Sequence, residues 1–241
     1  SEKVLNIQID PKYNTGHMTT LRAGVGTEDR YQATGMWMGM REGEQISVLG
    51  NLNNTNAPLF DFSTVGGGAR RGQGGGGRRG GGMFGGSDGL TKIGSIGLNY
   101  RKDFNDKLTV YGSYSYSHSN NTTISQRFQE NTLPNIMQTD SVQSNSNTVG
   151  ASHRFEANVE WKPTTKDYIK ISPQFGYDNS DVTTGTNSLT YRSNVFNNSQ
   201  AQDIVTNSTA PRFGISGLYN HKFNDKGRNV FVNMNFNNAK T

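Results

Sequence analysis

Apolar and polar residues alternate over many short segments of this chain. The alternation is plainest over residues 108–118, where Leu108, Val110, Gly112, Tyr114 and Tyr116 are apolar, aromatic or small and most residues between them carry hydroxyls. Because successive side chains of a β-strand point to opposite faces, this pattern predicts a strand with one apolar face and one wet face.

Further segments with the same pattern, which is weak over about residues 17–25, each predict a strand. They cover residues 4–9, about 17–25, 31–38, 45–53, 94–101, 154–162, 169–178, 212–222 and 229–237. Short polar turns are expected at residues 27–30, 41–44, 105–107, 163–166 and 224–227. Pro173 has no backbone N–H and predicts a bulge or an interruption in its ladder.

The connections between these segments differ in length. Alternate connections are short, whereas three others, about residues 55–89, 120–147 and 179–210, are predicted as long loops. For residues 120–147 a partly extended strand is the alternative. The first contains a glycine tract at residues 66–86 that is too costly in backbone entropy to hold regular structure. Such loops are uncommon in a compact soluble domain but typical of the outer side of an outer-membrane barrel.

Composition agrees with a barrel. Only 31% of residues are hydrophobic, 30 are glycine and the mean hydropathy is -0.74, whereas a soluble domain is about one half apolar. A barrel with a polar interior needs apolar residues on its outer face alone. No apolar run approaches the roughly 18 residues of a membrane-spanning helix.

Aromatic residues mark one side of the expected strands. Those within a few residues of short turns are Tyr100, Phe104, Trp161, Tyr168, Tyr219 and Phe223. Aromatic girdles of this kind lie at membrane interfaces. A β-sandwich shares the periodicity but not the loop asymmetry, so the fold expected is all-β, with antiparallel transmembrane barrel strands, short periplasmic turns and long extracellular loops.

Positive charge is concentrated in the glycine tract. Without Arg70, Arg71, Arg78 and Arg79 the Lys plus Arg count falls from 24 to 20, against 19 acidic residues. These four arginines are expected to contact anions from an extracellular loop. The alternative is an RGG-type nucleic-acid segment, which the scarcity of base-stacking aromatics disfavours.

A second candidate site lies on the wet face of the expected strands. Arg154, Glu156, Glu160 and Lys162 alternate with apolar residues and are expected to face the lumen. They could line a solute path or contact a plug, although solvated ion pairs are the simpler interpretation. Tyr111, an aromatic residue on the wet face, suits a lumen that is filled.

Other sequence motifs are weak evidence for a catalytic, cofactor or metal site. Residues 72–77 match a dinucleotide-binding pattern without its strand and helix, and residues 85–89 match a nucleophile elbow without its sheet. The four histidines lack ligand spacing, and there is no cysteine. Residues 178–181 (Asp-Asn-Ser-Asp) resemble part of a calcium loop but lack the remainder. We therefore expect no catalysis, no cofactor and no metal site.

Four blocks of sequence resemble the outer-membrane β-barrel proteins of the TonB-dependent receptor type common in Bacteroidota. They are GTEDRYQATG at 26–35, ISVLGNLNNTN at 46–56, DGL at 88–90 and GSIGLNY at 94–100. The match is most specific over residues 4–120. Receptors of this type place a plug domain before a barrel of about 22 strands.

The resemblance implies a domain division. Residues 1–12 look like the last strand of a plug or a lead-in, and residues 13–241 like the N-terminal part of a barrel of which eight or nine strands are present. A disordered Gly/Arg-rich loop is expected at about 56–89. The lack of a signal peptide, a TonB box and a C-terminal aromatic residue favours a fragment.

The resemblance also implies a function. The expected location is the cell outer membrane, and the expected activity is ligand capture and energised uptake. The partners would be outer-membrane lipid and lipopolysaccharide, the plug domain, the TonB complex and an extracellular ligand of unknown identity, without nucleic acid. The alternative is a small complete outer-membrane barrel that acts as a structural or adhesive surface protein.

Overall fold

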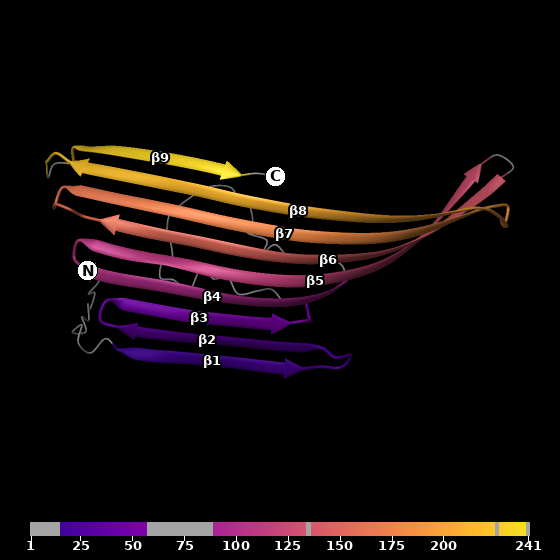
Figure 1. The fold of residues 1–241 in the computed structure, drawn as a ribbon, viewed down its shortest axis with the longest axis horizontal. Helices are drawn as coiled ribbons and strands as arrows, with labels where there is room; N and C mark the ends of the chain where they lie inside the picture. The colour runs from indigo at the N-terminus through magenta and orange to yellow at the C-terminus, as the bar shows by residue number, and fades with distance from the viewer. Residues whose placement is uncertain (1–14, 57–88, 134–135, 225–226, 240–241) are drawn as a thin grey trace, which may run out of the picture.

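The computed structural model describes residues 15–56, 89–133, 136–224 and 227–239. Within these ranges nine strands form one antiparallel sheet in sequence order (Figure 1). They are β1 (Gly16–Val25), β2 (Tyr31–Arg41), β3 (Glu44–Asn53), β4 (Leu90–Asn105), β5 (Leu108–Leu133), β6 (Ile136–Trp161), β7 (Asp167–Arg192), β8 (Val195–Lys222) and β9 (Asn229–Ala239). The all-β prediction is confirmed. Within the described ranges no helix is long and apolar enough to cross a membrane.

The loop predicted at residues 179–210 is wrong, and at residues 120–147 the alternative, extended strand, is the correct one. Residues 120–133 and 136–147 continue β5 and β6, and residues 179–192 and 195–210 continue β7 and β8, so that these strands are 26 to 28 residues long. Positive φ angles at Ser193 (45°) and Asn194 (66°) close the β7–β8 hairpin tightly. Alternation detects only strands with one apolar face, and both faces of these extensions are wet.

Cross-strand polar pairs accompany the ladder in these extensions. Ser144 and Thr186 hydroxyls lie 3.4 Å apart, and the Ser146 and Thr184 hydroxyls 3.0 Å apart. Asp140 accepts hydrogen bonds from Thr190 and from Gln138, which hold the pKa of this carboxyl below its usual value. Hydroxyl and amide side chains therefore replace apolar contacts as the partners between strands.

The ladder is interrupted where the sequence predicts it. Residues 172–173 of β7 have no ladder partner on β6, whereas Pro173 still lies opposite Ile215 of β8. Ser172 contacts β6 through its side chain, since its Oγ donates to Asn158 Oδ1 at 2.7 Å. A proline cannot donate a ladder hydrogen bond, so one side of the strand is unpaired.

Strand register places apolar residues on one face of the sheet, which we call the apolar face. One row across β4 to β8 consists of Leu98, Tyr114, Phe155, Phe175 and Phe213. These side chains are 40 to 47% exposed. The opposite face, which we call the polar face, carries Asn99, Ser113, Glu156 and Gln174 in the neighbouring row.

The apolar residues form a band of constant width on β5 to β8. It spans residues 108–116, 153–161, 169–177 and 211–219, which the register aligns with one another. Trp161 and Tyr219 lie at the edge next to the short turns, and Tyr116, His153 and Tyr177 lie at the other edge. Nine residues per strand match the roughly 9–11 residues that a tilted β-strand needs to cross a bilayer.

Burial is inverted relative to a soluble protein. Among the described residues only Leu49 and Ile93 are buried and hydrophobic. The buried polar residues, nearly all on the polar face, are Thr34, Ser47, Asn51, Asn53, Asn54, Thr91, Ser95, Asn99, Ser119, Ser152 and Asn158. The sheet therefore exposes its apolar face and covers part of its polar face.

The sheet is curved, and β1 and β9 form its two edges (Figure 1). Both edge strands run in the same direction because the number of antiparallel strands is odd. The geometry is compatible with a fragment of a barrel. The predicted plug strand at residues 4–9 and nearly all of the Gly/Arg-rich loop lie outside the described residues.

Candidate functional site: the polar face of the sheet

The structure separates the four charged residues that the sequence groups together. Arg154, Glu156 and Glu160 lie on the polar face of β6, opposite Ser115, Ser113 and Thr109 of β5 respectively. Lys162 follows the end of β6 and belongs to the turn, where its backbone N–H donates to the Lys107 carbonyl at 2.7 Å. The other predicted site residues, Arg70, Arg71, Arg78 and Arg79, lie outside the described residues.

Glu160 is part of a three-strand network. Its Oε1 accepts hydrogen bonds from Tyr111 Oη at 2.7 Å and from Lys170 Nζ at 3.0 Å. Lys170 Nζ also contacts Tyr111 Oη at 2.5 Å. The Lys170 side chain is only 15% exposed and that of Glu160 28%. Both charged groups of this half-buried ion pair also bond the Tyr111 hydroxyl, which offsets part of the cost of removing them from water.

Tyr111 is the centre of this network. Besides its hydroxyl contacts, its ring lies 5.1 Å from Lys170 Nζ and 5.5 Å from the Arg101 guanidinium carbon, both within cation–π range. An aromatic residue on the wet face is thereby explained by cations on β4 and β7. Lys170 and Arg101 were not predicted site residues, although both stand on polar positions of neighbouring strands.

A second charged pair lies farther along the polar face. Arg212 of β8 pairs with Asp178 of β7, and Ser152 Oγ of β6 donates to Asp178 Oδ1 at 2.6 Å. Arg154 and Glu156 are exposed between the two networks. The polar face therefore carries ion pairs at two levels and exposed charged side chains between them, of which Glu156 accepts a hydrogen bond from Asn158 Nδ2 at 3.3 Å. This arrangement is able to contact a polar solute or a polar protein surface.

The structure does not bring the two aspartates of residues 178–181 together. Asp178 pairs with Ser152 on the polar face, whereas Asp181 pairs with Val149 on the other face. Carboxylates on opposite faces of one strand cannot bind one ion. Within the described ranges no three His, Cys, Asp or Glu residues gather as metal ligands.

Asp167, the first residue of β7, has a strongly perturbed carboxyl outside the apolar band. It accepts hydrogen bonds from Thr164, from His221 Nδ1 at 2.7 Å and from Tyr219 Oη at 2.9 Å. These bonds, that from Thr164 first, lower the pKa of Asp167 to about 2. The cluster ties β7 to β8 at the rim of the sheet.

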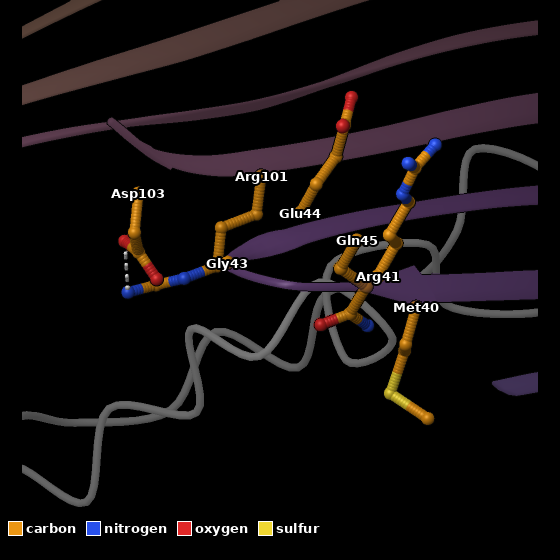
Figure 2. A pocket seen from close by; sticks show the side chains of 7 residues that line it. All are labelled: Met40, Arg41, Gly43, Glu44, Gln45, Arg101 and Asp103. Carbon is orange, nitrogen blue, oxygen red and sulfur yellow. Dashed lines mark hydrogen bonds and ion pairs between the residues drawn. The ribbon is translucent and has the colours of Figure 1, made fainter. Parts of the chain in front are cut away.

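A small cavity lies at the same rim, beside the β2–β3 turn (Figure 2). It has a volume of about 130 Å³ and is lined by Met40, Arg41, Gly43, Glu44, Gln45, Arg101 and Asp103. Arg101 pairs with Asp103 at 3.1 Å, and Thr109 Oγ1 donates to the same carboxylate oxygen at 2.7 Å. The volume suits a few water molecules rather than a larger solute.

No protein-family model matches the chain, and no curated protein matches it. The all-β fold is established by the structure, whereas the resemblance of the sequence to TonB-dependent receptors has no support from these comparisons, and what it implies for function is a proposal.

Proposed function

We propose that this chain forms part of the wall of a transmembrane β-barrel in the outer membrane, of the TonB-dependent receptor type. The observation that carries the proposal is the inverted burial, because an exposed apolar face suits lipid and a covered polar face suits a lumen. The nine-residue width of the apolar band supports the same conclusion.

In this proposal β1 and β9 pair with further strands of a larger barrel. A nine-stranded closure would place β1 parallel to β9, whereas bacterial single-chain barrels have an even number of antiparallel strands. Unpaired strand edges are unstable in lipid, because their backbone N–H and C=O groups would lack hydrogen-bond partners.

The polar face supplies the proposed uptake role. The networks around Glu160 and Asp178 give a polar wall with both signs of charge. Such a wall can hold a plug domain by ion pairs and hydrogen bonds while ligand binds outside. Uptake then requires plug movement driven by the TonB complex, with no chemistry catalysed.

Fractionation and capture of the full-length protein test this proposal. We expect the protein in the outer-membrane fraction of the cells that produce it, and we expect the immobilised periplasmic domain of TonB to retain it. A protein found only in the soluble fraction contradicts a barrel. A protein in the outer membrane that TonB does not retain contradicts the receptor and leaves a surface protein.

A second candidate function, surface recognition or adhesion, is favoured by the long hairpins. β5 continues from the end of the band at residue 116 to Leu133, which at about 3.3 Å per residue projects roughly 55 Å beyond the membrane. Replacing residues 120–147 and 179–210 by two-residue turns should leave insertion intact. Loss of cell attachment in that variant, with uptake unchanged, would favour this function.

A further inference from the structure

Four of the seven methionines of the chain gather on one hairpin. Met18 lies on β1 and Met36, Met38 and Met40 lie on β2. The register places Met18 directly opposite Met38, with Met36 and Met40 as its two diagonal neighbours. All four side chains therefore share the polar face, because Met36, Met38 and Met40 pair with Leu49, Ser47 and Gln45 of β3.

The spacing lets several sulfurs reach one point. Directly opposed residues of an antiparallel pair have Cβ atoms about 5 Å apart, and diagonal neighbours about 7–8 Å. A methionine side chain has three rotatable bonds, so thioethers attached at these positions can converge. Met18 and Met38 can reach one ion together with either Met36 or Met40. Met36 and Met40 lie four residues apart on β2, about 13 Å at 3.3 Å per residue, so only one of them can reach that ion at a time.

These thioethers are not core side chains. Met18 is 46% exposed and Met40 42%, on a face otherwise rich in hydroxyl and amide groups. Met38 Sδ accepts a contact from Gln45 Nε2 at 3.7 Å, which shows that its sulfur meets polar groups. In Figure 2 the Met40 side chain points to the opposite side of the hairpin from Arg41 and Glu44.

We propose that Met18 and Met38, with either Met36 or Met40 as a third ligand, form a binding site for a soft monovalent metal ion, Cu(I) or its analogue Ag(I). Thioether sulfur is a soft, uncharged ligand that favours Cu(I) over Mg²⁺ or Ca²⁺. It does not titrate, so the site binds at acidic pH, where histidine and carboxylate ligands become protonated. The proposal depends only on the β1–β2 register and is independent of the uptake function.

Ag(I) titration of the full-length protein in detergent at pH 5.5 tests the site. We expect the Met18→Leu/Met38→Leu variant to bind one equivalent of Ag(I) less than the wild type, or to bind it at least tenfold more weakly. Leucine conserves the volume of methionine, so folding should be retained. The matched control is Met137→Leu/Met234→Leu, which alters methionines outside the hairpin and should bind as the wild type does.

Two further measurements complete the test. Met36→Leu and Met40→Leu should each weaken binding, and a tenfold excess of Zn²⁺ should not displace Ag(I). Competition with a chromophoric Cu(I) chelator under reducing conditions should give the same order of variants. Unchanged Ag(I) binding in the double variant, equal loss in the control, or displacement by Zn²⁺ would overturn the proposal.

Discussion

At the scale of single residues, two buried serines on β3 and β4 contribute differently to the stability of the polar face. Ser47 is fully buried, and its hydroxyl accepts a hydrogen bond from Asn99 Nδ2 at 3.3 Å. Ser95 on the same face is 8% exposed, and within the described structure its hydroxyl has no partner. Two serines on adjacent strands therefore differ in what their hydroxyls contribute.

Alanine substitution separates the two serines. Ser47→Ala leaves the buried Asn99 amide without its acceptor and should lower the free energy of unfolding by about 1–3 kcal/mol. Ser95→Ala removes an unpaired hydroxyl and should leave stability unchanged or raise it. Urea unfolding in detergent, followed by tryptophan fluorescence, measures both. Equal destabilisation by the two changes would contradict the assigned contacts.

Asp167 predicts a pH dependence at the rim. Its folded pKa of about 2 lies below the ordinary value of 3.8, so its stabilisation is present above about pH 4 and is lost as the pH falls toward 2. In Asp167→Asn the free energy of unfolding should therefore fall much less between pH 4 and pH 2 than in the wild type. In Thr164→Val this fall should be intermediate. Urea midpoints at several pH values measure this slope. If the urea midpoint of Asp167→Asn changes with pH as steeply as that of the wild type, the Asp167 carboxylate is not the source of the pH dependence.

Glycine at position 43 is required by the β2–β3 turn. Its φ is +70°, and a Cβ there would lie 3.1 Å from the Asp103 carbonyl oxygen. The Gly43 carbonyl also accepts the Asp103 N–H at 2.7 Å. Gly43→Ala should lower the free energy of unfolding by about 1 kcal/mol or more, as measured by the same urea unfolding. Gly227 is the control, because its φ is +91° and a Cβ there would meet open space. Gly227→Ala should therefore lose only the free energy of forcing a positive φ on alanine.

At the scale of strands, the two faces of β8 make opposite predictions. Ile215 lies in the middle of the apolar band and Ser216 lies on the polar face. Ile215→Arg should oppose insertion by about 2–4 kcal/mol, as expected at the bilayer midplane, and Ser216→Arg should be tolerated. Folding into liposomes, scored by heat-modifiable migration in gels, compares them. Equal tolerance of both arginines would argue against lipid contact at Ile215.

The sequence predicts those strands whose two faces differ. Residues 108–118 and 154–162 alternate, and their faces agree with the register. Residues 120–133 and 179–192 are strand without alternation, because both faces meet water and no period remains to be read. The Glu160–Lys170–Tyr111 network joins residues up to 59 positions apart, and only the strand pairing brings them together.

At the scale of the whole molecule, the sheet has three zones along its strands. The short turns and the Asp167 cluster lie at one rim, the apolar band follows, and the hairpins of β5 to β8 extend beyond the band with two wet faces. Each zone meets a different environment if the chain crosses a membrane. The central claim is therefore an orientation: the apolar face meets lipid and the polar face meets water.

Spin labels on single cysteines measure this orientation directly, because the 241 residues contain no cysteine. Labels would replace Leu98 and Ile215 on the apolar face, Ser115 and Ser216 on the polar face, and Leu189 in the β7–β8 hairpin, with the full-length protein in liposomes. We expect the apolar-face labels to collide more with oxygen than with a water-soluble nickel chelate, and the other labels to show the reverse. Apolar-face labels that collide mainly with the nickel chelate would contradict the account.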